Sequence, residues 1–360
     1  MRAKFSHVKL SGICTVIPER KIDIDDEVQY YTDISKIERL KNVVGVHYRA
    51  VVGDNITPAD LMEDVANRLL DDMKVERNSV DALICVLDFP DYKIPPTSCI
   101  LQGKLGLTDK CLSFDITHGC AGFVYGLYVA HSLVEGGSCK RVLLLVGDTK
   151  SHTINIRDRV SAPLFGDGAS ATLLEYSQEE VTASFILGTR GNQYQNIMIP
   201  AGGARLPCSD ITRKEQTDEF GNVRSLEQFY MNGKEVFDFT INTVPQSLKE
   251  MMLYANVSGE DVDYLVMHQA NKSILANIAM RAGFKNMDKV PTKTLEKYGN
   301  LSVASIPSVF NDQLSQELSS GKRQILISGF GVGLSWGVAL LNINQIYCPQ
   351  PFVYREKLDE

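Results

Sequence analysis

Cys120 lies where an extended apolar stretch ends and a helix is expected to begin, in the segment SFDITHGCAGFVYGLYVAHSLVEGG. The expected helix carries small or apolar residues between Ala121 and Leu133 and ends at Gly136. Amide N–H groups at the start of a helix have no intrahelical partner and carry partial positive charge. They favour a thiolate and lower its pKa, so the segment predicts a nucleophilic cysteine. An inert, buried thiol at a tight turn is the alternative that the segment leaves open.

Two polar residues in the second half of the chain could act together with this cysteine. His268 ends the apolar stretch VDYLVMH, and Asn300 follows YG just before a helix of small residues. Taken singly, His268 is typical of a structural histidine at the end of a strand, and Asn300 of a helix N-cap. Only their relation to Cys120 favours a functional interpretation.

An internal repeat provides that relation. VDALICV from Val80 matches VDYLVMH from Val262, and RVLLLVGD from Arg141 matches RQILISGF from Arg323. Both pairs are separated by 182 residues, and the same offset carries Cys120 to position 302, beside Asn300. We therefore expect a duplicated α/β unit with buried strands and covering helices. Since ligand-binding groups gather at strand ends in such sheets, Cys120, His268 and Asn300 are expected at one central site.

The repeat also predicts how the chain is divided. An N-terminal half is expected over residues 1–175, and a C-terminal half over residues 176–346. An inserted loop is expected at about residues 202–224, where the sequence is irregular and charged. Residues 347–360 form a tail to which the sequence assigns no role.

Composition excludes several classes of protein. The net charge of −7 argues against non-specific binding of nucleic acid, which requires lysine and arginine to neutralise phosphates. The eight cysteines contain no C-x-x-C pair, which is typical of reduced thiols in the cytoplasm. The N-terminus lacks the apolar stretch of a signal peptide, and no apolar run approaches the length of a membrane span. His118 and Cys120 form an H-x-C pair, but without further ligand spacing it does not predict a metal site.

The glycines of SGFGVGLSWG, at Gly329, Gly331 and Gly333, invite comparison with a dinucleotide-binding loop. That motif requires a helix to begin after the glycines, whereas LSWGVALLNI predicts another strand. We therefore expect a hairpin turn, which can offer a backbone N–H group to an oxyanion.

Six motifs in order resemble the β-ketoacyl-acyl-carrier-protein synthase III family of the thiolase superfamily. They are CAGF with Cys120, RDRVSAPLFGDGA, MNGKEVF, HQAN with His268, YGN with Asn300, and GFGVGLSWG. The resemblance extends from about Val8 to Leu341. It implies an α/β protein with the thiolase-like five-layer αβαβα fold, made of two duplicated halves.

The resemblance also implies a decarboxylating Claisen condensation for fatty-acid initiation or a related pathway. Cys120 would take an acyl group from acyl-CoA, and malonyl-acyl carrier protein would then lose carbon dioxide and attack the acyl-cysteine. His268 and Asn300 would stabilise the enolate, and backbone N–H groups of Cys120, Val332 and Gly333 the tetrahedral intermediates. Coenzyme A thioester is a substrate here, and neither a cofactor nor a metal is implied.

Several binding residues follow from the resemblance. Arg159 matches the arginine that completes the adenine clamp for coenzyme A, and Arg39 falls near the tryptophan and arginine of the best-known members. Lys272 stands beside Ser273, which replaces an arginine used for carrier-protein docking. Ile94 aligns near a residue that the neighbouring subunit contributes to the primer pocket, so a homodimer is implied. The pair His118-Gly119 replaces the commoner small pair before the cysteine.

Two other functions remain open. The first is a thiolase-fold acyltransferase that moves an acyl group from Cys120 to a hydroxyl or an amine, and it would gain less from Asn300. The second is a non-catalytic partner subunit, which would have no chemical reason to keep all three site residues.

Overall fold

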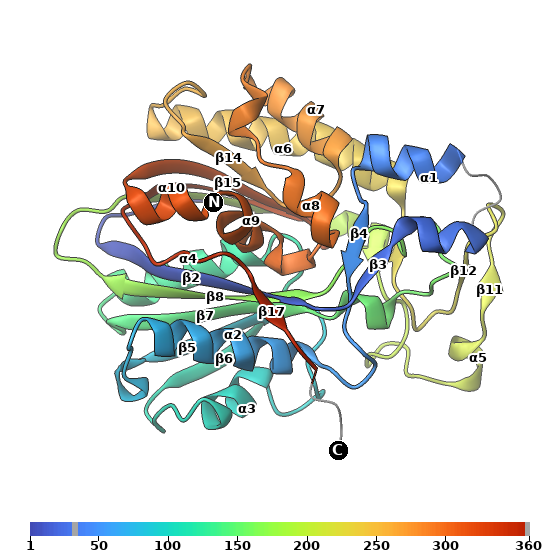
Figure 1. The fold of residues 1–360 in the computed structure, drawn as a ribbon, viewed down its shortest axis with the longest axis horizontal. Helices are drawn as coiled ribbons and strands as arrows, with labels where there is room; N and C mark the ends of the chain where they lie inside the picture. The colour runs from blue at the N-terminus through green and yellow to red at the C-terminus, as the bar shows by residue number, and fades with distance from the viewer. Residues whose placement is uncertain (31–34, 357–360) are drawn as a thin grey trace.

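Two β-sheets with helices on both sides of each sheet form the protein (Figure 1). The computed structural model describes residues 1–30 and 35–356. The strands of the first sheet, in spatial order, are β17 (Phe352–Tyr354), β2 (Val8–Pro18), β8 (Gly168–Tyr176), β7 (Arg141–Asp148), β5 (Ala82–Leu87) and β6 (Leu112–Thr117). Those of the second are β1 (Arg2–Phe5), β9 (Ala183–Thr189), β16 (Ser335–Ile343), β15 (Arg323–Gly331) and β14 (Tyr264–Met267).

Helices fill three layers around these two sheets (Figure 1). The outer layer of the first sheet consists of α2 (Pro58–Asp72) and α3 (Thr97–Lys104), and that of the second of α6 (Gly233–Ala255) and α7 (Lys272–Ala282). Between the sheets lie α4 (Gly122–Glu135) and α9 (Ser305–Gln313), which contact strands of both. The expected five-layer αβαβα fold is thus confirmed.

The duplication is visible in matching strands. The parallel pair β5 and β7 in the first sheet corresponds to the parallel pair β14 and β15 in the second, at the offset that the repeat predicts. The copies diverge at one edge, because the segment 182 residues after β6 forms the helix α8 (Lys293–Tyr298) instead of a strand. Each end of the chain joins the sheet of the opposite half. The N-terminal strand β1 pairs with β9 in the second sheet, and the tail strand β17 pairs with β2 in the first.

Shorter elements gather at the end of the molecule where the functional residues were expected (Figure 1). They are the two-stranded pairs β3 (Lys21–Asp23) with β4 (Tyr48–Ala50), β10 (Ile197–Met198) with β13 (Tyr230–Met231), and β11 (Gln216–Thr217) with β12 (Val223–Arg224). The short helices α1 (Ser35–Arg39) and α5 (Asp210–Arg213) lie at the same end, whereas α10 (Ser315–Ser320) lies at the opposite end (Figure 1). The chain also forms the π-helical turn η2 (Leu40–Val44) and the 3₁₀ turns η1 (Ile24–Tyr30), η3 (Arg77–Ser79), η4 (Lys150–Thr153), η5 (Gly191–Asn196), η6 (Met287–Lys289) and η7 (Ser302–Ala304). In the described part of the chain, no helix combines the length and apolarity needed to cross a membrane.

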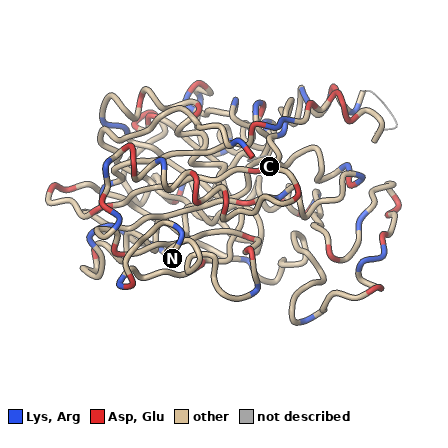
Figure 2. Tube along the Cα trace, turned by 60° about the horizontal axis from the view of Figure 1, so that its bottom comes forward, with Lys and Arg blue, Asp and Glu red and all other residues tan. Residues whose placement is uncertain are grey.

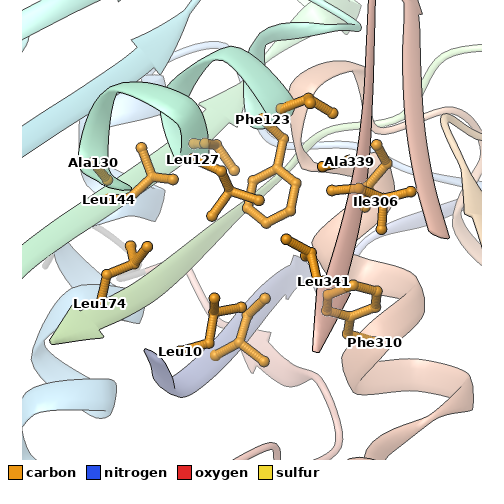
Figure 3. Packing of buried hydrophobic residues seen from close by; sticks show 14 of the residues in the cluster. Leu10, Phe123, Leu127, Ala130, Leu144, Leu174, Ile306, Phe310, Ala339 and Leu341 are labelled. Atoms are coloured by element: carbon orange, nitrogen blue, oxygen red, sulfur yellow. The ribbon is translucent and has the colours of Figure 1, made fainter. Parts of the chain in front are cut away.

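The central helices are buried on nearly all sides. Phe123 of α4 and Phe310 of α9 are fully buried, and they lie in one cluster with Leu174 of the first sheet and Leu341 of the second (Figure 3). Removing this much apolar surface from water stabilises the contact between the two halves. The packing of α4 and α9 therefore fixes how the halves meet.

Replacing Phe123 by alanine would leave a cavity in this cluster. We expect Phe123→Ala to lower the free energy of unfolding by about 3–5 kcal/mol, measured by urea denaturation followed by circular dichroism. Phe220→Ala is the control, because Phe220 is 74 % exposed. An equal effect of the two substitutions would contradict the central role assigned to this packing.

Candidate active site

One cavity of about 260 Å³ is lined by Cys120, His268 and Asn300. Cys120 comes from the first half of the repeat, and the other two residues come from the second. The structure thus brings together the three residues that the sequence singled out. Most of the other lining residues are apolar, with Phe165, Phe229 and Phe330 among them.

Cys120 lies between β6 and α4, as expected, and remains partly exposed. The chain of β15 passes directly against it. A Cβ atom on Gly331, whose φ is +156°, would lie 2.7 Å from the Cys120 Cβ and 2.8 Å from Sγ. A backbone hydrogen bond links Val332 to the Cys120 sulfur. Glycine at position 331 therefore makes room for the thiol, and the turn that follows supplies it with a polar contact.

The expectation of a lowered pKa for Cys120 was wrong. Burial raises the pKa of Cys120 to about 11, because the protein around the sulfur replaces water that would solvate a thiolate. The positive charge of Lys150 and the hydrogen bond from Val332 oppose this shift without reversing it, while Asp88 adds to it. The start of α4 alone does not outweigh the loss of solvation.

His268 follows β14 and is buried, with 3 % of its surface exposed. Burial lowers the pKa of His268 to about 3, and the charge of Lys150 contributes in the same direction. The imidazole is therefore neutral at physiological pH. Its Nε2 atom lies 3.4 Å from the Asn300 Nδ2 atom.

Asn300 is held by both its side chain and its backbone. Its Oδ1 atom accepts hydrogen bonds from the Ser302 N–H group, at 3.0 Å, and from the Ser305 hydroxyl, at 3.1 Å. The backbone of Asn300 pairs with the first half, since its N–H donates to the Leu164 carbonyl and its carbonyl accepts from Gly166. The bond to Ser302 resembles the N-cap contact considered as an alternative, and it also directs Nδ2 toward His268.

The glycine segment forms the expected hairpin between β15 and β16. Gly331 and Val332 line the cavity, whereas Gly333 is not among the lining residues. The hairpin thus brings the Val332 backbone, and not that of Gly333, to the cavity wall.

A second hollow opens beside the cavity and shares Leu40, Val44 and Val160 with it. Arg39 and Arg159 both line this hollow, so the structure brings these two predicted binding residues together at an entrance to the cavity. Phe220 lies beside them, and its carbonyl accepts a hydrogen bond from the Arg159 guanidinium. Sequence reasoning missed Phe220, because it lies in an irregular, charged loop with no periodic signal.

Lys272 and Ile94 occupy different places. Lys272 begins α7, directly after Asn271, which lines the cavity, and it forms an ion pair of 3.2 Å with Glu296. Ile94 is 84 % exposed and does not line the cavity of its own chain. A single chain therefore places Lys272 at the rim of the site and leaves Ile94 outside it.

Two charged residues of the cavity, Asp88 and Lys150, were also missed from the sequence. Asp88 directly follows β5, and Lys150 begins η4 two residues after β7. The rule that functional groups gather at strand ends could have identified both.

The Nε2 atom of His118 lies 3.2 Å from the Ser335 hydroxyl. In residues 1–30 and 35–356, no cluster of three metal-ligating side chains is present.

Known proteins are similar to this chain in sequence and in fold. Models of 3-oxoacyl-[acyl-carrier-protein (ACP)] synthase III match residues 114–191 and, for its C-terminal part, residues 253–343. A Campylobacter jejuni protein, provisionally named 3-oxoacyl-[acyl-carrier-protein] synthase 3, is 39 % identical over 99 % of this chain and 100 % of its own length. The β-ketoacyl-[acyl-carrier-protein] synthase III of Neisseria gonorrhoeae is 30 % identical over 93 % of this chain and 99 % of its own. The crystal structure of a 3-oxoacyl-(acyl-carrier protein) synthase from Burkholderia xenovorans superimposes with a TM-score of 0.92 at 32 % identity, covering 98 % of this chain and 99 % of its own.

The raised pKa of Cys120 predicts how its alkylation by iodoacetamide depends on pH. Only the thiolate reacts, so the rate should rise about tenfold per unit between pH 7 and pH 10, without a plateau in that range. Peptide mass spectrometry measures the rate for each thiol, and the exposed Cys208 serves as an internal control. A rate for Cys120 that levels off at or below pH 10 would show that the pKa is not raised.

Proposed function

The chain belongs to the 3-oxoacyl-[acyl-carrier-protein] synthase III family of condensing enzymes, and we propose that it joins an acyl-CoA primer to malonyl-acyl carrier protein. The products are 3-oxoacyl-acyl carrier protein, carbon dioxide and free coenzyme A. The observation that carries the proposal is the presence of Cys120, His268 and Asn300 along one cavity.

In the first step, the Cys120 sulfur attacks the thioester carbon of the primer, and coenzyme A leaves as its thiol. Backbone N–H groups of Cys120 and Val332 are proposed to stabilise the negative oxygen of the tetrahedral intermediate, whereas Gly333, expected from the sequence to contribute, does not line the cavity. For Val332, support comes from its hydrogen bond to the sulfur. The raised pKa of Cys120 means that the thiol must lose its proton during acylation, and the positive charge of Lys150 favours that loss.

In the second step, the malonyl group loses carbon dioxide, and the resulting enolate attacks the acyl-cysteine carbonyl. With the proton of the neutral His268 ring on Nε2, its N–H and that of Asn300 Nδ2 are two donors separated by 3.4 Å. Donors at this separation can both reach one thioester oxygen, and they stabilise it as negative charge develops. The low pKa of His268 supports a role in hydrogen bonding, because the ring carries no extra proton to transfer.

Substrate binding completes the proposal. Arg39 and Arg159 would hold the nucleotide end of coenzyme A, since both line the entrance hollow. We further propose a cytoplasmic homodimer in which the exposed Ile94 reaches the primer pocket of the other subunit. Malonyl-acyl carrier protein would then enter by the same route as acyl-CoA, with Lys272 at the rim as a contact for the acidic carrier.

The test of this function is product formation from acyl-CoA and malonyl-acyl carrier protein, followed by mass spectrometry of the carrier. Cys120→Ser should reduce the product by at least about a thousandfold, because the serine hydroxyl has no base placed to activate it. Circular dichroism of the variant controls for folding. Transfer of the acyl group to a hydroxyl or amine, without release of carbon dioxide, would favour the acyltransferase alternative instead.

Carrier docking makes a separate prediction. Lysine, arginine and acidic residues are interspersed along the chain, so any basic dock must be local (Figure 2). Besides Lys272, the helix α7 carries the exposed Arg281 in its last turn. Neutralising Lys272 and Arg281 together should raise KM for malonyl-acyl carrier protein about tenfold and leave acylation by acyl-CoA unchanged. Lys110→Ala/Lys140→Ala is the matched control, since both residues lie before strands of the first sheet, at the end away from the cavity. Equal loss of both half-reactions would contradict the docking role.

A further inference from the structure

The cavity holds a buried ion pair, of which the proposed reaction uses only the positive charge of Lys150 near Cys120. The Lys150 Nζ atom lies 2.7 Å from the Asp88 Oδ2 atom, and the two side chains are 4 % and 14 % exposed. Both residues line the cavity that contains Cys120, and they are the charged members among its described lining residues.

The surrounding residues fit this pair closely. A Cβ atom at Gly119 would lie 2.5 Å from the Asp88 Oδ2 atom, so the glycine before Cys120 makes room for the carboxylate. The rings of Phe89 and Phe229 lie 4.9 and 4.7 Å from the Lys150 ammonium. These aromatic faces favour a cation between them.

A second buried carboxyl group, that of Asp148, contacts the backbone of Asp88. The Asp88 N–H group donates to the Asp148 Oδ1 atom at 2.9 Å. Burial, and then the charge of Asp88, raises the pKa of Asp148 to about 7, whereas Asp88 and Asp148 together keep Lys150 protonated despite its burial. When Asp148 is protonated, the cluster offers one carboxylate and one ammonium and has no net charge.

Stability does not explain such a pair. Removing two opposite charges from water carries a desolvation cost that their attraction rarely offsets in full, and apolar side chains of similar volume usually stabilise a core at least as well. The remaining cavity wall is mostly apolar, so few neighbouring groups offset the cost of burying these two charges. A role in recognising a ligand accounts for it better.

The hydrogen bonds of the pair are incomplete. The Lys150 ammonium donates one hydrogen bond, to Asp88 Oδ2, although it carries three N–H groups. Asp88 Oδ1 accepts no hydrogen bond from any residue that the structure describes. A hydroxyl group can accept from the ammonium and donate to the free carboxylate oxygen at the same time. An alkyl group would leave the ammonium and the free carboxylate oxygen without a hydrogen-bond partner. A ligand carboxylate would be repelled by the negative charge of Asp88.

The position of the pair identifies which part of a substrate meets it. The entrance hollow shares Leu40, Val44 and Val160 with the cavity but is lined by neither Asp88 nor Lys150. If the pantetheine arm of coenzyme A enters there and its thioester carbon reaches Cys120, the acyl chain must continue to the inner side of the sulfur. Asp88 and Lys150, which line the cavity but not the entrance hollow, are the charged groups that such a chain can meet.

We propose that Asp88 and Lys150 form a polar subsite for a hydroxyl group, so that the primer of this enzyme is a hydroxyacyl thioester and not a plain alkyl one. This inference rests on the proposed acylation of Cys120. It assigns substrate selection to two residues that lie beside the nucleophile and take no part in carbon–carbon bond formation.

The test compares acylation of Cys120 by four thioesters of equal chain length, butyryl-, 3-hydroxybutyryl-, 4-hydroxybutyryl- and succinyl-CoA, using intact-protein mass to measure rates. For the wild-type protein, kcat/KM for at least one hydroxyacyl-CoA should exceed those for butyryl- and succinyl-CoA by about tenfold or more. In the double variant Asp88→Asn/Lys150→Met, which removes both charges together, the preference over butyryl-CoA should fall to about one.

Each other result overturns the proposal in a recognisable way. A wild-type enzyme that prefers butyryl- or succinyl-CoA, or does not discriminate, has no hydroxyl subsite, and this comparison stands even if the double variant fails to fold. An unchanged preference in a folded double variant places selection elsewhere. Absence of acylation by all four thioesters, with Cys120 still open to iodoacetamide, would instead contradict the acyl-CoA step of the proposed function.

Discussion

The burial of α4 and α9 between the two sheets is the constraint on which the rest of the structure depends. Phe123 and Phe310 pack there in one cluster with strands of both halves, so neither helix can shift without exposing apolar surface (Figure 3). Cys120 lies just before α4, and Asn300 just before the turn that leads into α9. The same packing that joins the halves therefore holds the nucleophile and the amide at one cavity.

Backbone contacts between the two halves also hold Cys120 and Asn300 in place. The segment Leu164–Gly166 of the first half pairs with the backbone of Asn300, and β15 of the second half passes against Cys120. Each half thus supports a functional residue of the other. This interlocking explains why motifs far apart in the sequence serve one site: RDRVSAPLFGDGA supports Asn300, and GFGVGLSWG borders Cys120.

Much of this arrangement could be predicted from the sequence, because it rests on patterns that a single chain displays. The strand pairs at a common offset predicted the duplication, and the offset from Cys120 to the neighbourhood of Asn300 predicted that their turns meet. The hairpin after Gly329 followed from the strand pattern beyond the glycines. Such features depend on periodicity and on residue types with narrow structural preferences.

Other properties of the site could not be predicted, because they depend on burial and on contacts between residues far apart in the sequence. The start of a helix predicted a low pKa for Cys120, but the depth of burial decides the sign and raises it. Asp88 and Lys150 are remote in sequence and meet only because β5 and β7 are neighbours in the sheet. Phe220 reaches Arg159 through an irregular loop, and the place of Ile94 depends on a second subunit.

The central claim is that an acyl group on Cys120 is consumed by an enolate that His268 and Asn300 stabilise. Its most direct test is a single-turnover chase, in which the acylated protein is mixed with malonyl-acyl carrier protein and followed by intact mass. The account predicts that the adduct disappears into 3-oxoacyl-acyl carrier protein, and that in Asn300→Ala it forms normally but persists at least about a hundredfold longer. Loss of the adduct at equal rates in both proteins, or an adduct that malonyl-acyl carrier protein never removes from the wild type, would contradict it.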